Sequence, residues 1–378
     1  MSDITIQAWN FRVLNHLSWS PRGVCLLSGP NGSGKTTVLD VLIFLRELFE
    51  RGHEAALQAV DSEYLKRIDS PQNEPVVLQV EVGDIRWKLR LMMGSNGLQG
   101  TYGEELYRGS DIILRAAMGQ EDFYWGAQQR FRDETRCCAK WLWDRGETPW
   151  MKPLSDMLSG IRVYKSYSLQ EVQRYERIDT LSASLSQNGK NLWSVLANWK
   201  SSPIRYQGQY EWVMAKAKKA FPGLISTIEF DRGFPFIYRP GAMEADQGLP
   251  PRCMADGLLT GLLHLTAVAG AAPGSLIAFD EMENQLHPYA IRLLIEAMRE
   301  KAEEKDLGII LTTHSPIVMN TFRDEPENVY VFESATPGGA VPTAITDLHS
   351  EEWLTHAKLG TLYDRLEFSA PVMDEKMP

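Results

Sequence analysis

The segment GPNGSGKTT combines glycines, a lysine and two threonines in a spacing suited to binding phosphate groups. Gly29, Gly34, Lys35 and Thr36 match the pattern G-x-x-x-x-G-K-[ST] in full. A short apolar run precedes the segment and a helical pattern follows it, so the backbone N–H groups converge at a helix N-terminus. We therefore predict that the loop binds the phosphates of ATP through Gly29, Pro30, Asn31, Gly32, Ser33, Gly34, Lys35, Thr36 and Thr37.

Two side chains of this loop have the chemistry to act on phosphates. Lys35 is predicted to neutralise the negative charge that develops during phosphoryl transfer, and the Thr36 hydroxyl to occupy one Mg²⁺ position. A chance glycine-rich turn is the alternative interpretation. The predicted strand before the loop and the predicted helix after it favour phosphate binding.

A second segment, LIAFDEMENQLHP, supplies carboxylates at the end of an apolar run. In a doubly wound nucleotide-binding fold, the carboxyl end of such a strand lies beside the phosphate loop. Asp280 is predicted to hold Mg²⁺ through water, and Glu281 to orient and deprotonate the attacking water. A solvated acidic turn is the alternative for this pair taken alone.

A histidine follows the next apolar run, in the segment LTTHSP. We expect His314 to reach the γ-phosphate and the attacking water as a hydrogen-bond donor. His287, which precedes Pro288, is expected to be structural. The predicted catalytic residues are therefore Glu281, His314 and Lys35.

These residues need a fold that brings strand ends together, and the periodicity of the chain predicts one. Apolar runs predict strands over residues 3–9, 24–28, 76–82, 85–92, 161–165, 224–230, 276–279, 308–311 and 329–332. Helical spacing predicts helices over residues 36–50, 128–142, 189–222, 254–269 and 289–304. Gly83-Asp84 predicts a hairpin turn. The alternation of strands and helices in the last third indicates a parallel α/β sheet.

Composition places the chain among ordinary globular proteins and narrows its partners. The 378 residues are 44% hydrophobic, enough for one large core or two modest ones. The formal net charge of -10 disfavours non-specific attraction to nucleic acid. Four cysteines without a CxxC pair indicate free thiols in a reducing cytoplasm. The sequence does not begin like a signal peptide, and no apolar run of about 18 residues predicts a membrane span.

Two groups of residues have both a structural and a functional interpretation. Lys216, Lys218 and Lys219 are expected to form the wet face of an amphipathic helix rather than a nucleic-acid patch. Residues 94–160 are rich in tryptophan and arginine, which favours a satellite core, with base stacking or docking of a protein partner as alternatives. The residues concerned are Trp125, Trp141, Trp143, Trp150, Arg130, Arg132, Arg136 and Arg145.

Together, GPNGSGKT, LIAFDEMENQLHP and LTTHSP resemble the RecF-like and OLD-like branch of ABC ATPases, which includes many AAA-labelled bacterial ATPases. The opening ITIQAWNFRVLNHL and the segment NGKNLWSVLANW are similar to that branch as well. The resemblance covers residues 1–50 and 160–365. It implies an α/β fold, namely a P-loop NTPase of ABC type whose mixed sheet carries an antiparallel β subdomain and a helical subdomain.

The family also implies a homodimer, or a higher oligomer, that closes on two ATP molecules. A signature motif from the second copy would complete each site, and Met254-Ala255-Asp256-Gly257 is the candidate here. Asp256 and Gly257 would then contribute to nucleotide binding. The family usually has Ser where this chain has Ala255, so closure would be weaker or would depend on a partner protein. A plain helix N-cap at Asp256 is the alternative.

We expect three regions along the chain. Residues 1–93 would form an ATPase lobe with the phosphate loop and the β subdomain, residues 94–160 an insertion of unassigned role, and residues 161–378 a second ATPase lobe. The heptad repeats of SMC-type arms and the membrane contacts of ABC transporters are not predicted. The residues after Val331 are too few for a nuclease domain of the OLD type.

The favoured hypothesis is a cytoplasmic, ATP-gated switch that hydrolyses ATP and controls a separate effector protein in bacterial anti-phage defence. A RecF-like DNA repair or recombination ATPase is the alternative, and the acidic net charge does not favour it. A binding module with a vestigial nucleotide site is a third hypothesis. Asp280, Glu281 and His314 argue against it, whereas Ala255 is in its favour.

Overall fold

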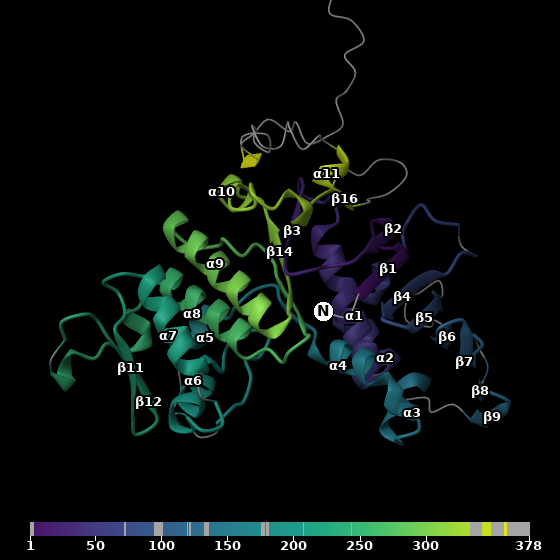
Figure 1. Ribbon diagram of the computed structural model, residues 1–378, viewed down its shortest axis with the longest axis horizontal. Helices are drawn as coiled ribbons and strands as arrows, with labels where there is room; N and C mark the ends of the chain where they lie inside the picture. The colour runs from purple at the N-terminus through teal and green to yellow at the C-terminus, as the bar shows by residue number, and fades with distance from the viewer. Residues whose placement is uncertain are drawn as a thin grey trace, which may run out of the picture.

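The computed structural model describes residues 4–71, 73–93, 101–118, 120, 122–131, 136–174, 178, 181–206, 208–242, 244–332, 342–348 and 359–360. Within these residues, the strands form an eight-stranded, a six-stranded and a two-stranded sheet. The six-stranded sheet lies centrally in Figure 1, with a helical lobe on the left and the eight-stranded sheet on the right. The described part of the chain is therefore α/β, as predicted.

The six-stranded sheet has the order β10-β13-β14-β3-β15-β16. Its strands are β10 (Arg162–Tyr164), β13 (Leu276–Phe279), β14 (Gly308–Thr313), β3 (Val24–Ser28), β15 (Val329–Phe332) and β16 (Pro342–Ala344). The first five strands are parallel, and β16 joins β15 antiparallel. The predicted parallel strands are confirmed, and their carboxyl ends share one edge of the sheet.

The two faces of this sheet belong to two hydrophobic cores, because successive side chains of a strand point to opposite faces. Leu26 of β3 and Leu311 of β14 pack in one core with α8 (Asp256–Ala269) and α9 (Pro288–Lys305). Leu27 and Ile310 pack in the other with α1 (Lys35–Arg51). This double coverage explains why these strands are continuously apolar.

The eight-stranded sheet is antiparallel and has the order β2-β1-β4-β5-β6-β7-β8-β9. Its strands are β1 (Ile4–Phe11), β2 (Leu14–Trp19), β4 (Val76–Val82), β5 (Ile85–Met92), β6 (Thr101–Arg108), β7 (Asp111–Ala116), β8 (Asp122–Trp125) and β9 (Gln128–Phe131). The predicted hairpin is confirmed, since Val82 pairs with Ile85 and Gly83 has a φ of 61°. Buried and half-buried residues alternate along β5, so one face packs on the core.

The predicted helix over residues 128–142 is wrong. Residues Gln128–Phe131 form β9, which pairs with β8 across a turn in which Gly126 has a φ of 56°. Within this range, the structure describes a helix only from Cys138, where α3 (Cys138–Asp144) begins. Apolar spacing resembled a helical period here, but the Gly126 turn and the neighbouring strand decide the pairing.

The helical lobe consists of α5 (Leu169–Gln173), α6 (Leu192–Ser201), α7 (Gln209–Ala220) and α8, with the hairpin of β11 (Thr227–Asp231) and β12 (Phe234–Tyr238). The pattern over residues 189–222 thus contains two helices rather than one. On α7, Val213, Ala217 and Ala220 are buried, whereas Lys218 and Lys219 are exposed. Lys216 pairs with Glu300 of α9. The amphipathic interpretation of the lysines is therefore confirmed.

The tryptophans of residues 94–160 pack against the core of the eight-stranded sheet. Arg130 lies over the Trp125 ring at 4.5 Å and forms an ion pair with Glu147 at 2.7 Å, and Arg145 lies over Trp141 at 3.9 Å. The structural interpretation is thus confirmed, but these residues join the main core of the eight-stranded sheet instead of a separate satellite core. Arg132 lies outside the described residues. The boundaries of the three regions stay a prediction, although β6 to β9 continue the sheet that β4 and β5 begin.

The remaining described helices are α2 (His53–Ala59), α4 (Lys152–Gly160), α10 (Pro316–Asn320) and α11 (Ile345–Leu348). The α4 helix packs on α1 and on β13, next to the central sheet. In the described ranges of the chain, every helix is too short or too polar to cross a membrane.

Candidate nucleotide-binding site

The predicted phosphate loop connects β3 to α1, as the motif requires. Gly29, Gly32 and Gly34 have φ angles of 152°, 76° and 111°, which favour glycine. A Cβ atom at Gly29 would lie 2.5 Å from the carbonyl oxygen of Phe332 on β15. Glycine is therefore required at this position by backbone conformation and by the neighbouring strand.

Lys35 is the buried cation of the loop, with a 4% exposed side chain. Its Nζ donates hydrogen bonds to the carbonyl oxygens of Gly29 at 2.8 Å and Pro30 at 3.0 Å. Burial lowers the pKa of Lys35 to about 8, and the nearby acids Asp280, Glu281 and Glu283 oppose this shift. The ammonium group is thus short of compensating negative charge, which an incoming phosphate would supply.

The loop and the strand-end acids meet at Thr36. Its hydroxyl donates to Oδ2 of Asp280 at 3.3 Å, although the two residues are 244 positions apart. Thr312, at the end of β14, accepts a hydrogen bond from the backbone N–H of Glu281 at 2.9 Å and donates to Oδ1 of Asp280 at 2.5 Å. The Thr312 hydroxyl therefore fixes both acids, a role that the sequence did not reveal.

Glu281 and His314 face each other at the same sheet edge. Glu281 Oε1 lies 3.9 Å from His314 Nε2, and Glu281 Oε2 accepts a hydrogen bond from Asn284 Nδ2 at 2.9 Å. Glu281 has a φ of 48°, a conformation that turns the chain sharply after β13. Burial first, and then the Lys35 charge, lower the pKa of His314. His314 is therefore neutral near pH 7.

Glu283 holds the end of β14 in place, and the sequence analysis missed it. Its Oε1 accepts hydrogen bonds from the Thr313 hydroxyl at 2.8 Å and from the His314 backbone N–H at 3.0 Å. Its buried Oε2 has no hydrogen-bond partner among the described residues. In the sequence, the only signal for a role of Glu283 was the acid-rich pattern DEMEN, which places a third carboxylate three residues after Asp280.

His264 connects the helical lobe to the acidic turn and was also missed. Nε2 donates to the Met282 carbonyl oxygen at 3.1 Å, and Nδ1 accepts from the Tyr167 hydroxyl at 3.0 Å. Burial lowers the pKa of His264 to about 4, so the ring is neutral. The ring also packs edge-on against Phe279 of β13. This histidine lies in α8, whose residues from Leu258 to Ala269 are all buried.

Lys165 follows β10 and lines a small cavity of about 160 Å³ together with Asp280 and Glu281. Its Nζ pairs with Asp40, which lies on α1 one turn beyond Thr36. The opposite oxygen of Asp40 pairs with Arg12 at 2.6 Å. This ion-pair network ties the helix of the phosphate loop to β10 and to the β1–β2 hairpin.

The signature candidate lies at the start of α8. Ala255 is the N-cap residue, so the alternative of an N-cap at Asp256 is wrong. The Asp256 carboxylate instead accepts a hydrogen bond from Gln173 of α5 at 2.6 Å. A Cβ atom at Gly257 would lie 2.6 Å from the carbonyl oxygen of Gln285. His287, as expected, is structural, since its Nδ1 caps α9 by accepting from the Tyr289 N–H.

Comparison with known proteins places this site in a wider context. A family described as "AAA domain, putative AbiEii toxin, Type IV TA system" matches residues 176–320, which include the strand-end acids and His314. No curated protein matches the chain. A solved structure of an SmcHead bound to the C-winged helix domain of ScpA is similar, with a TM-score of 0.53 and 12% identity over 90% of this chain and 96% of that chain.

Two further solved structures match less well. The SMC head domain from Thermotoga maritima has a TM-score of 0.45 and 12% identity, over 91% of this chain and 99% of that chain. The Smc head domain derived from Pyrococcus furiosus, bound to the C-terminal domain of ScpA, has a TM-score of 0.47 and 11% identity, over 91% and 96%.

The fold is therefore that of a P-loop NTPase of ABC type, as predicted. The family match and the fold together support an ATPase domain. The RecF-like and OLD-like branch, and the roles of the individual site residues, stay predictions.

Proposed function

We propose that this chain is a Mg²⁺-dependent ATPase of the RecF-like/OLD-like branch, which closes on ATP as a homodimer and controls a separate effector protein. The observation that carries the proposal is the joined hydroxyl–carboxylate cluster. Thr36 of the phosphate loop contacts Asp280, and Thr312 holds Asp280 and Glu281 together. Three segments far apart in the sequence thus meet at one sheet edge, which supports the proposed hydrolytic site.

The residues present fit a magnesium nucleotide. The glycine loop offers backbone donors, and the buried Ser33 hydroxyl has no partner among the described residues. Burial lowers the pKa of Lys35 more than the nearby acids raise it, so a phosphate would add stabilising negative charge. Bound ATP would supply the phosphoryl group, with Mg²⁺ offsetting its charge. Thr36 and Asp280 would hold the ion, because hydroxyl and carboxylate oxygens are the ligands it prefers.

Glu281 is the proposed general base, and its neighbours orient it. Asn284 holds one carboxylate oxygen, while the other faces His314. The Glu281 side chain is 48% exposed, so water can reach it. The neutral His314 ring can donate or accept a hydrogen bond near the attacking water, and Glu283 keeps the His314 backbone in position.

The proposed dimer depends on α8. The helix starts at Asp256, so its first N–H groups are available to an anion from a second copy. The hydrogen bond from Gln173 holds the Asp256 carboxylate in one position, and we propose that it keeps this negative charge away from the phosphate. Ala255 removes a hydroxyl donor, so we propose that an effector assists closure.

A separate effector is supported by two of the similar proteins. The solved SmcHead is bound to the C-winged helix domain of ScpA, and the description of the matching family names a putative AbiEii toxin and a Type IV TA system. We propose a cytoplasmic role in bacterial anti-phage defence on this basis and on the sequence resemblance.

The test is light scattering of purified Glu281→Gln protein with and without ATP and Mg²⁺. We expect a shift from a smaller to a larger species that needs both, because the variant binds ATP but hydrolyses it slowly. Lys35→Ala is the matched control and should show no shift. The proposal is contradicted if the mass of the Glu281→Gln protein is the same with and without ATP and the wild-type protein does not hydrolyse ATP.

A further inference from the structure

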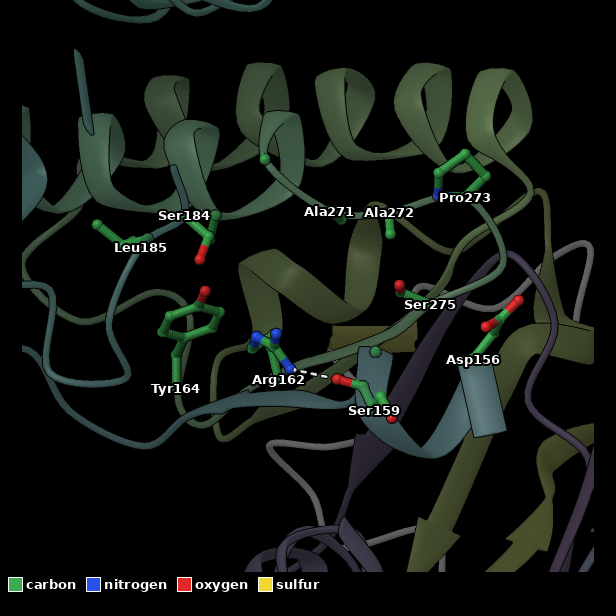
Figure 2. A pocket seen from close by; sticks show the side chains of 13 residues that line it. Asp156, Ser159, Arg162, Tyr164, Ser184, Leu185, Ala271, Ala272, Pro273 and Ser275 are labelled. Carbon is green, nitrogen blue, oxygen red and sulfur yellow. Dashed lines mark hydrogen bonds between the residues drawn. The ribbon is translucent and has the colours of Figure 1, made fainter. Parts of the chain in front are cut away.

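A second cavity lies at the sheet edge opposite the phosphate loop. Its volume is about 550 Å³, and it is bounded by the end of α4, the amino ends of β10 and β13, and the connection from α8 to β13. Figure 2 shows Arg162 and Tyr164 of β10 on its floor, below Ala271, Ala272 and Pro273. This volume is in the range of small-molecule sites.

Arg162 has donors to spare in this cavity. Its Nη1 donates to the carbonyl oxygens of Ser159 at 2.7 Å and Ile161 at 2.8 Å, which caps the end of α4. No described residue accepts a hydrogen bond from its Nε or Nη2, and none of the described carboxylates forms an ion pair with it. The nearest lining acid, Asp156, is paired with Lys152. One edge of the guanidinium fork is therefore free.

Two largely buried residues, Tyr164 and Ser275, bring hydroxyl groups to the same cavity. Tyr164 is 4% exposed and Ser275 is 2% exposed. In the described part of the chain, neither hydroxyl has a hydrogen-bond partner, although both side chains line the cavity. Figure 2 shows the Tyr164 hydroxyl on the same side as the Arg162 guanidinium. Both hydroxyl groups can therefore donate to a ligand or to water in the cavity.

The chemistry of these groups selects the ligand. Free donors converge from Arg162, Tyr164 and Ser275, so the ligand must bring acceptors and negative charge. Both α4 and α8 end at this cavity, and helix C-termini disfavour a second negative charge. A carboxylate with one charge fits better than a phosphate with two. An apolar part of the wall is formed by Leu185, Ala267, Ala271, Ala272 and Pro273, and the remaining polar lining residues are Asp156, Ser159 and Ser184.

We propose that this cavity binds a monocarboxylate with a compact apolar body, held by the free edge of Arg162 and the Tyr164 hydroxyl. The proposal goes beyond the ATPase function, since neither the phosphate loop nor the strand-end acids line this cavity, although Tyr164 also lines the small cavity beside Lys165. Binding is measured without nucleotide, so the proposal and the ATPase function can fail separately.

The test is a titration of the full-length protein, followed by NMR, with 4-methylpentanoate and 3-phenylpropanoate as probes. We expect saturable binding at millimolar concentration for at least one probe. The corresponding amides should bind at least about tenfold more weakly, because a charged hydrogen-bonded pair is lost. Arg162→Leu should cause a similar loss, and Tyr164→Phe a loss of about threefold to tenfold.

Tyr164→Phe keeps the ring and its packing on Phe279, so it guards against a folding defect in Arg162→Leu. Circular dichroism of each variant checks the fold. The proposal is overturned by a wild-type protein that binds neither carboxylate, or by probe affinities that Arg162→Leu and Tyr164→Phe leave unchanged. Tighter binding of butylphosphonate than of both carboxylates would overturn the choice of ligand.

Discussion

The eight-stranded sheet and the edge of the six-stranded sheet both position acidic side chains, but their polar groups are satisfied to different degrees. Glu104 on β6 is fully buried and accepts hydrogen bonds from Trp87 Nε1 at 2.8 Å and from the backbone N–H groups of Cys138 at 2.7 Å and Ala139 at 2.8 Å. It thereby caps the N-terminus of α3, where a negative charge is stabilised. This acid needs nothing from outside the protein.

The edge of the six-stranded sheet is satisfied only in part. Ser33 Oγ and Glu283 Oε2 are buried without partners among the described residues, and Lys35 is desolvated. Such groups cost free energy unless a ligand, an ion or water completes them. The comparison teaches that the complete network serves folding, whereas the incomplete one is suited to binding.

The sharpest test of this difference is Glu281→Gln. We expect ATP turnover to fall by about 100-fold to 1,000-fold, because a general base is lost. The free energy of unfolding should hardly change, since the Glu281 side chain is 48% exposed. Turnover is measured by phosphate release and stability by urea unfolding. Wild-type turnover in this variant would remove Glu281 from the role of base.

Glu104→Gln should show the opposite pattern. The amide can no longer accept all three hydrogen bonds, so we expect a loss of about 2–3 kcal/mol in the free energy of unfolding. Turnover per folded molecule should stay at the wild-type level. Glu105→Gln on the same strand is the matched control, because Glu105 pairs with the exposed Arg90 and Arg115. Its expected loss is about 1 kcal/mol or less. Equal losses of unfolding free energy in the two variants would contradict a special structural role of Glu104.

His264 predicts a dependence of stability on pH. Its pKa is about 4 in the folded protein against about 6.5 when unfolded. The unfolded chain therefore binds more protons between these values, and stability is lost as pH falls through this window, by up to about 3 kcal/mol. Urea unfolding of the wild type and of His264→Gln from pH 7 to pH 4 measures it. This pH-dependent loss of stability should disappear in His264→Gln. If the free energy of unfolding falls with pH equally in both proteins, His264 is not its cause.

Lys35 predicts the smallest effect, on ATP affinity. Its pKa of about 8 in the free protein should rise on contact with phosphate, so binding takes up a proton above pH 8. Affinity should therefore fall by about tenfold between pH 7 and pH 9. Calorimetry in buffers of different ionisation enthalpy measures this uptake. In Lys35→Arg, whose guanidinium stays charged, the affinity for ATP should be lower than in the wild type but should not change between pH 7 and pH 9.

The phosphate loop and the strand-end acids could be predicted because their requirements are local. Gly29, Gly32 and Gly34 mark backbone turns, and Asp280 and Glu281 end a continuously apolar run. A strand, a glycine turn and a helix in succession leave little choice of local structure. The same local rules failed over residues 128–142, because pairing with β8 overrides helical spacing.

Only the tertiary structure decided which distant groups complete the site. Thr312 reaches the acids because β14 lies between β13 and β3. The order of strands in a sheet cannot be predicted from a single segment of the sequence. Glu283, His264 and Lys165 act through contacts across elements, which the packing of α8, β10 and α1 determines. The sequence by itself thus determined the loop and the strand-end acids, because both follow from short-range backbone requirements. Sheet order and core packing, which join residues far apart in the chain, decided how those acids are held.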